Sequence, residues 1–207
     1  MTKVVAKTHM RTLSGRLLSV DDFAPTPEDA ALHLGRIFRW AGAVVCPWTV
    51  IHHSVYVEAS AELEGHSPEV RLHALIHDVQ EIVTGDMPSP IKARIRSAKE
   101  TQNELDALLW KAWGIPEPSA KVKEAVHKID KRAMAVEAWM VAVPYKDRPE
   151  LAGQFGHPPA KEEKEIVDKI SGIPSMTWND SVPPLATLFL VRLRLLQMMV
   201  CRNSPRT

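Results

Sequence analysis

The sequence predicts an all-α fold within a single domain over residues 1–207. Helix start signals recur along the chain, apolar residues repeat at helical spacing, and strand signals do not recur. A chain of 207 residues is long enough for one domain with a sizeable core, and nothing in its length demands two.

The first predicted helix begins at Thr26, a suitable N-cap residue, with Pro27 at the first helical position and Asp29 completing a capping-box pattern. Apolar residues continue on one face, so we expect this helix to extend as far as Phe38. A second helix is predicted from Thr49 to about Glu64, where a glycine follows.

The third predicted helix starts at Ser67 and Pro68 and continues until Gly85, because apolar residues recur at helical spacing throughout. The segment "DMPSPIK" then forms a rigid connection, since Pro88 and Pro90 fix their own φ and push the preceding residues away from helix.

Helical patterns occupy most of the remaining chain. We expect helices over 91–113 with a break near Ser97, over 119–143, over 160–172, and from the Pro183-Pro184 pair to the C-terminal end. The segment "PYKDRPELAGQFGHPP", rich in proline and glycine, is predicted to be a loop. The last helix is apolar but carries Arg192 and Arg194, which favours a buried helix over a membrane span.

Composition narrows the function classes. The 26 Lys and Arg residues nearly balance the 25 Asp and Glu residues, so neither nucleic acid nor an anionic membrane is expected as the main partner. Cys46 and Cys201 are too few for a disulfide scaffold and are predicted to be free thiols. With no signal-peptide pattern at the N-terminus, we expect a cytoplasmic protein, in the host cytoplasm if phage-encoded.

The stretch "ALIHDVQEIVTGDMPSPIK" places His77, Asp78 and Glu81 in one apolar helical run. At about 100° per residue these side chains share one edge of an α-helix. Imidazole nitrogen together with carboxylate oxygen suits Zn, Mn or Co, and at least two further ligands must come from elsewhere in the chain.

"HDVQE" followed by "TGDMPSPIK" resembles the HD-domain phosphohydrolases, in particular the branch of bacterial 5'-deoxynucleotidases and phage dATP triphosphohydrolases. The resemblance implies four ligands around one divalent cation: His53 in "VIHHSVYV", with His52 as its rival, then His77, Asp78 and the closing Asp130 in "VHKIDKRAMAVE". The cation would be Mn, Co, Zn or Mg. The fold that the resemblance implies is the HD-domain helical bundle.

Further residues match this branch. The resemblance assigns Glu81 to water activation and gives substrate contacts to Arg39, Trp40, Asp86, Ser89 and Lys92. Glu81 and Asp86 could hold a second metal. The resemblance and the apolar last helix also suggest a homo-oligomer, a dimer or higher.

These assignments fit phosphate-ester chemistry. A metal neutralises the anionic oxygens and lowers the pKa of a bound water. Glu81, one turn after His77, can accept the proton of that water. Arg39 and Lys92 can hold the phosphate, Arg39 with a planar fork and Lys92 as a point charge.

Each residue also has an ordinary interpretation. The pair His77-Asp78 could be hydrogen-bonded, His53 could be a core histidine, and Asp130 could pair with its basic neighbours. Arg39 could cap its helix, Trp40 could fill the core, Asp86 could stabilise a turn, and Lys92 could be solvated.

The sequence therefore predicts a metal-dependent phosphohydrolase of 2'-deoxynucleotides, either a dNTP (dATP) triphosphohydrolase of phage type or a dNMP 5'-nucleotidase. Alternatives are a hydrolase of signalling nucleotides such as ppGpp, which Ile82 in place of the expected acid disfavours, and a non-catalytic nucleotide or metal sensor. A helical nucleic-acid-binding module is disfavoured by the balanced charge.

Overall fold

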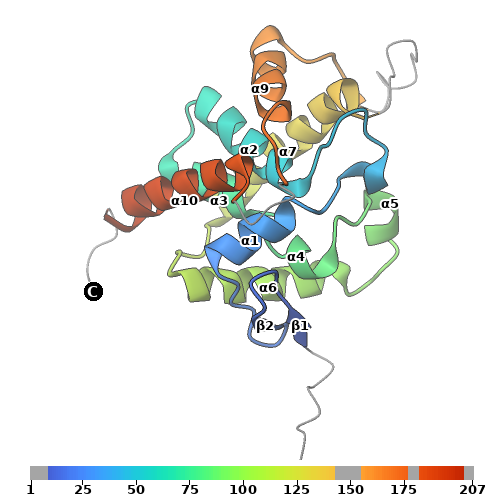
Figure 1. Ribbon diagram of the computed structural model, residues 1–207. Helices are drawn as coiled ribbons and strands as arrows, with labels where there is room; N and C mark the ends of the chain where they lie inside the picture. The colour runs from blue at the N-terminus through green and yellow to red at the C-terminus, as the bar shows by residue number, and fades with distance from the viewer. Residues whose placement is uncertain (1–8, 143–154, 177–181, 203–207) are drawn as a thin grey trace, which may run out of the picture.

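The computed structural model describes residues 9–142, 155–176 and 182–202 and confirms the all-α prediction for them (Figure 1). The helices are α1 (Pro27–Leu34), η1 (Trp40–Gly42), α2 (Val50–Leu63), α3 (Pro68–Ile76), α4 (Glu81–Thr84), α5 (Ser89–Lys92), α6 (Ala98–Trp113), α7 (Ala120–Met140), α9 (Lys161–Ser171) and α10 (Pro184–Arg202).

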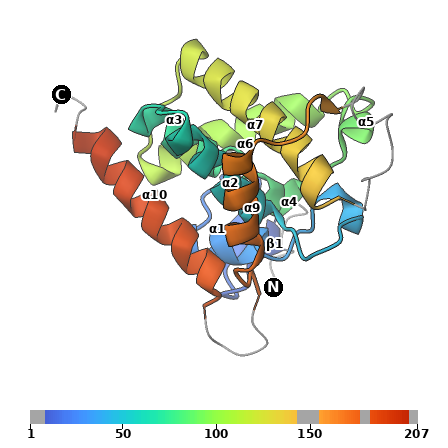
Figure 2. The same cartoon turned by 90° about the horizontal axis from the view of Figure 1, so that it is seen from above.

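The core lies where α2, α3 and α7 pack against one another. Helix α9 lies across α2, and α10 packs along α3 and α1 on the outer side, as the two views show (Figures 1 and 2). The largest fully buried side chains include Trp48, Tyr56, Leu72, Leu75 and Phe189. This packing fixes the helices on which the polar candidates stand.

Three predicted helix starts are confirmed by their caps. The side chains of Thr26, Ser67 and Ser119 accept hydrogen bonds from the backbone N–H groups of Asp29, Val70 and Val122. A serine or threonine oxygen satisfies an N–H that has no partner inside the helix, which is why these residues mark helix starts in the sequence.

A short antiparallel hairpin was not expected from the sequence. Strands β1 (His9–Arg11) and β2 (Leu17–Ser19) pair with each other at the start of the described chain. The turn between them is fastened to α1, because the backbone N–H and hydroxyl of Ser14 donate to the carboxylate of Asp29 at 3.2 and 2.9 Å. Asp29 therefore holds the hairpin instead of completing a capping box.

The first helix ends earlier than predicted, at Leu34. A side chain at Gly35 would place its Cβ 2.5 Å from the carbonyl oxygen of Ser175, so the two backbones approach each other closely here. Beyond Gly35 the chain becomes extended, and Phe38 forms an antiparallel β-bridge with Thr49. The prediction that helix continues to Phe38 is wrong because a tertiary backbone contact overrides the apolar pattern.

The predicted helix over 67–85 is interrupted at His77–Gln80. Here the N–H of Val79 donates to the carbonyl of Ile76 at 3.1 Å, and the N–H of Glu81 donates to that of Asp78 at 3.0 Å. These bonds span three residues, so each residue turns the chain by about 120° instead of about 100°. His77 and Asp78 follow the end of α3, whereas Glu81 begins α4.

The segment after Gly85 also differs from its prediction. Ser89–Lys92 forms a single helical turn, and α6 starts only at Ala98, so no helix runs on from residue 91. The predicted break near Ser97 is confirmed. Helix α7 ends at Met140, slightly before the predicted end, and most of the predicted loop after it lies outside the described residues.

A buried carboxylate links three helices. The side chain of Glu58 on α2 is fully buried and accepts hydrogen bonds from Arg71 on α3 at 2.7 and 2.9 Å. Its second oxygen accepts a bond from Arg192 on α10. Since a buried carboxylate is costly without partners, these bonds tie α10 to α2 and α3.

The last helix is buried on one face only. Leu185, Phe189, Leu193 and Leu196 are buried against the protein, whereas Val191, Leu195, Met198 and Met199 are exposed. By length and composition the segment Pro184–Cys201 would suffice to cross a membrane, a test that core helices of soluble proteins also pass. The prediction of a buried helix holds for the face that packs on α1 and α3. Cys46 and Cys201 are free, as predicted.

Candidate metal centre

Three parts of the chain bring four potential metal ligands together. His53 comes from α2, His77 and Asp78 from the turn after α3, and Asp130 from α7. The Nε2 of His53 lies 3.2 Å from the Nε2 of His77, 3.0 Å from Oδ1 of Asp130 and 3.5 Å from Oδ2 of Asp78. One ligand atom each of His53, His77 and Asp130 lies within 4.8 Å of the others.

The other nitrogen of each imidazole is already engaged. The Nδ1 of His53 lies 2.6 Å from Oε1 of Glu137, and the Nδ1 of His77 lies 2.8 Å from the carbonyl oxygen of Ala74. A carbonyl can only accept, and an ionised carboxylate likewise, so both Nδ1 atoms carry hydrogen and donate. In the neutral rings each Nε2 then presents its lone pair to the cluster, as a metal-binding histidine does.

The electrostatics of the cluster favour positive charge. Burial lowers the pKa of His77, but the carboxylates of Asp78 and Asp130 outweigh this effect and raise that pKa well above its ordinary value. Burial would raise the pKa of Asp130, yet its contacts with His53 and His77 lower it well below its ordinary value. Protons and a divalent cation would compete for these groups.

His52 turns away from the cluster. Its Nδ1 accepts a hydrogen bond from the backbone N–H of Thr49 at 3.1 Å, and its Nε2 lies 3.2 Å from the carbonyl oxygen of Ile173. Burial lowers the pKa of His52 to about 4. Of the two adjacent histidines, the structure directs His53 towards the other candidates.

The basic neighbours of Asp130 are paired elsewhere. Lys128 lies 2.7 Å from Glu124, and Arg132 lies 2.6 Å from Glu163 on α9. A helix places neighbouring residues on different faces. Asp130 is therefore not the partner of Lys128 or Arg132 in the structure.

Arg39 is buried beside the cluster, between three carboxylates. Its Nε donates to Oε2 of Glu137 at 3.0 Å, and its Nη1 lies 3.6 Å from Asp78 and 3.5 Å from Asp86. Burial alone would lower the pKa of Arg39, but these carboxylates, Glu137 first among them, raise it, so the guanidinium remains charged. The structure thus places the predicted Arg39 and Asp86 next to the predicted Asp78.

Glu137 is the residue of this site that sequence reasoning missed. It is fully buried on α7 and holds both the imidazole of His53 and the guanidinium of Arg39. Burial would raise the pKa of Glu137, but Arg39 and His53 lower it to about 2. One signal was available: an acid inside the apolar run "AMAVEAW", seven residues after Asp130 and therefore on the same helical face.

We expect Glu137→Gln to weaken metal binding about 10- to 100-fold, because an amide cannot fix the imidazole of His53 as a carboxylate does. Calorimetric titration of the metal-free protein with Mn²⁺ would measure this change. Glu163→Gln is the matched control, since Glu163 also pairs with an arginine but lies away from the cluster. Equal metal affinity in the two variants would contradict the positioning role of Glu137.

Glu81 presents an unsatisfied oxygen near the cluster. The residue is 3% exposed, and within the described residues its Oε2 has no hydrogen-bond partner. Burial, followed by the charges of Asp78 and Asp86, raises the pKa of Glu81 to about 9. A buried carboxyl without a partner is costly, so this oxygen fits a bound water or a second cation.

Trp40 follows Arg39 in a strained conformation. Its φ of 58° and the φ of 51° at Ala41 lie in the left-handed region, which side chains other than glycine rarely adopt. The indole nitrogen of Trp40 is buried without a partner in the described part of the chain, and its ring meets Phe155 edge-on at 5.8 Å. Strain of this kind gathers at functional sites, and the substrate contact of Trp40 stays a prediction.

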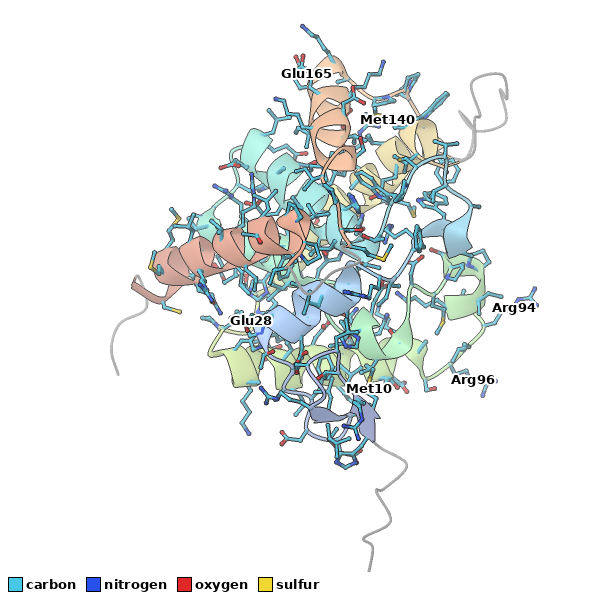
Figure 3. All side chains as sticks on the ribbon, viewed as in Figure 1. Met10, Glu28, Arg94, Arg96, Met140 and Glu165 are labelled. Atoms are coloured by element: carbon cyan, nitrogen blue, oxygen red, sulfur yellow. The ribbon has the colours of Figure 1, made fainter. Side chains whose placement is uncertain are left out.

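The two residues predicted on the connection to α6 are less closely placed. Lys92 ends α5, and its charge acts on the carboxyl of Glu81. Ser89 is exposed at the start of α5, and no hydrogen bond joins it to the cluster within residues 9–142. Arg94 and Arg96, in the same basic segment, extend outward from the body of the protein (Figure 3).

Known proteins resemble this chain over the part that carries most of the cluster. Residues 34–109 match the family model described as 5'-deoxynucleotidase YfbR-like. An uncharacterized protein of Rhodobacter capsulatus is 35% identical over 143 residues, which cover 64% of this chain and 72% of that relative. The uncharacterized protein YfdR of Escherichia coli is 28% identical over 88 residues, 42% of this chain and 47% of YfdR. With its helical fold, its His-Asp cluster and these matches, the chain belongs to the YfbR-like 5'-deoxynucleotidase family of the HD-domain superfamily, whose members are metal-dependent nucleotide phosphohydrolases.

Proposed function

We propose that this chain hydrolyses the 5'-phosphate ester of 2'-deoxynucleoside monophosphates. The observation that carries the proposal is the convergence of two imidazole Nε2 atoms and two carboxylates beside the buried guanidinium of Arg39. The family description, 5'-deoxynucleotidase, supports the monophosphate as substrate. Because deoxynucleotides are metabolites of the cytoplasm, we also propose a cytoplasmic location for the protein.

The four clustered side chains, His53, His77, Asp78 and Asp130, would hold the metal. Nitrogen and oxygen donors without thiolate suit Mn, Co, Zn or Mg, in agreement with the predicted set. When bound, such a cation neutralises phosphate charge and makes water more acidic. Glu81 and Asp86 would be the ligands of a second cation.

The remaining residues have roles that their positions support. Glu81 has a free carboxyl oxygen at the cluster. A bound cation would favour its ionised form, which would orient the attacking water and accept its proton. Arg39 keeps its charge and would hold the phosphate, with Lys92 adding a second cation from α5. Trp40 would border the sugar, and Asp86 would fix Arg39 through their contact at 3.5 Å.

The test is turnover by metal-stripped protein after addition of Mn, Co, Mg or Zn. Ribo- and deoxynucleoside mono- and triphosphates serve as substrates, and mass spectrometry identifies the products. Deoxynucleoside and free phosphate from the deoxynucleoside monophosphates are the expected products. Faster turnover of the ribonucleotides would contradict the preference for the deoxy sugar.

Other products would replace the proposal with one of its alternatives. Intact triphosphate released from dATP would identify a triphosphohydrolase, and pyrophosphate released from ppGpp would identify a hydrolase of signalling nucleotides. Tight nucleotide binding without turnover under any metal would identify a sensor. The mass of the protein in solution, measured in the same preparations, tests the proposed homo-oligomer.

A further inference from the structure

A cavity of about 610 Å³ lies between α3, α6 and α7, directly beside two of the candidate metal ligands. His77 and Asp130 form one end of its wall. Helices α3 and α7 pack closely against each other. Side chains of α6 also line the cavity.

One face of α6 supplies polar and aromatic side chains to this cavity. Asn103, Asp106 and Trp110 line it, and their spacing of three and four residues places them on the same side of the helix. The buried Leu105 and Leu109 anchor α6 to the core. Asp106 and Trp110 are partly buried in the wall of the cavity, whereas Asn103 is exposed.

A buried histidine in the cavity wall has an unused hydrogen-bonding atom. His73 on α3 is 4% exposed, and its Nε2 has no hydrogen-bond partner within the described residues. Its ring meets Trp110 edge-on at 5.7 Å. The backbone carbonyl of Pro116 interacts with this ring, and a ligand could add a hydrogen bond at Nε2.

Asp106 lies deeper in the cavity than the lysines. It is partly buried and makes no hydrogen bond in the described part of the chain. Lys99 and Lys123 are exposed, and Lys123 is paired with Glu117 at 3.0 Å. Burial raises the pKa of Asp106 to about 7, so this carboxyl can donate as well as accept a hydrogen bond, as the polar edge of a base requires.

We infer that this cavity receives the nucleobase of the substrate, with Asp106, Asn103 and His73 contacting the polar edge of the base. The inference rests on the proposed function for the position of the phosphate at the metal cluster. Cavities of 300–1,000 Å³ with apolar walls and a few polar groups are typical binding sites for small planar molecules. Trp110, Val126 and Pro118 supply apolar wall, and the three polar residues supply selectivity.

Two inhibitors test the two ends of the site separately. A deoxynucleoside without phosphate probes the cavity, and inorganic phosphate probes the metal cluster. We expect Asp106→Asn to raise the inhibition constant of the preferred deoxynucleoside about tenfold, because one hydrogen bond of a charged group is altered. Inhibition by phosphate should change less than about twofold, and the ranking of the four bases by kcat/KM should change.

Glu104→Gln is the matched control, because Glu104 is exposed on α6 and does not line the cavity. Thermal melting of both variants checks that they are folded, and Asn103→Leu repeats the test at a second position. An unchanged base ranking together with an unchanged deoxynucleoside constant would overturn the inference. Weaker inhibition by phosphate or tripolyphosphate, with deoxynucleoside inhibition unchanged, would also overturn it by placing the phosphate tail in the cavity.

Two different measurements distinguish failure of the proposed hydrolysis from failure of the proposed base site. If the wild-type protein hydrolyses no nucleotide, that function is lost, whereas deoxynucleoside binding by calorimetry still tests the cavity. Binding that weakens in Asp106→Asn but not in Glu104→Gln would support the base site even then. Absence of deoxynucleoside binding in the wild type would overturn it.

Discussion

Asp78→Asn is expected to lose bound metal and hydrolytic activity together. Oδ2 of Asp78 lies 3.2 Å from the Nε2 of His77 and 3.5 Å from that of His53, so the carboxylate supplies charge at the centre of the cluster. The amide keeps the shape but removes the charge. Loss of one partner from a buried ionic group costs about 3–5 kcal/mol, which corresponds to a decrease in metal affinity of roughly 150- to 4,000-fold.

Metal content after dialysis, together with turnover of the best substrate, measures this effect. Asp168→Asn is the control, because Asp168 is exposed on α9 and lies far along the chain from the cluster. The Asp78→Asn variant should also lose a contact with Arg39, whose Nη1 lies 3.6 Å from Asp78. Full activity in Asp78→Asn would show that Asp78 is not a required metal ligand and that the proposed set of four ligands is wrong.

Glu81→Gln is expected to bind the first metal and to turn over about 10²–10⁴ times more slowly. A placed general base contributes rate enhancement of that size, and glutamine cannot accept a proton. The metal should be retained, since Glu81 is not one of the four clustered ligands. Turnover and metal content are measured as for Asp78, with Glu165→Gln as control. Glu165 is exposed on α9, a helix that carries none of the four clustered ligands (Figure 3). Unchanged turnover would exclude Glu81 as the base.

The same substitution should stabilise the metal-free protein above acidic pH. Burial and neighbouring carboxylates raise the pKa of Glu81 to about 9, above its ordinary value of 4.5. Because the folded pKa is the higher one, the stability that the protonated group contributes is complete below 4.5 and is lost as the pH rises to about 9. Glutamine does not ionise, so its advantage grows by about 1.4 kcal/mol per pH unit in this window.

Urea unfolding of the metal-free proteins at pH 5 and pH 8 measures this difference. The variant should be close to the wild type at the lower pH and more stable at the higher one. A difference in unfolding free energy that stays constant with pH would show that Glu81 is not held protonated by its surroundings.

The elements that local chemistry specifies could be predicted from the sequence. Thr26 and Ser119 cap their helices as expected because a hydroxyl beside a free N–H acts within a few residues. The ends of helices depended on distant contacts: α1 stops where Gly35 meets the backbone of Ser175. The hairpin of three-residue strands was missed because such strands are too short to show an alternating pattern.

The site residues that belong to a distinctive sequence motif could be predicted from the sequence. His77 and Asp78 stand in a distinctive run of residues, and the structure brings them to His53 and Asp130. The break between α3 and α4 was not visible, since no glycine or proline marks it. Glu137 and Asp106 were missed because each is a single acid on a helix, and only the packing of helices shows that it faces inward.

The segment that matches the family model does not contain all the residues that its own buried side chains need as partners, and Glu58 is an example. Residues 34–109 contain the family match, but Arg192 on α10, which is bonded to Glu58, lies 83 positions beyond it. A chain trimmed to the matched segment would keep a buried anion on the helix that carries His53 and would remove one of its two cations. Insertions and fusions should therefore be placed in surface turns, and the C-terminal helix should be kept. Homologues that lack an arginine at the position of Arg192 should carry an uncharged residue at the position of Glu58.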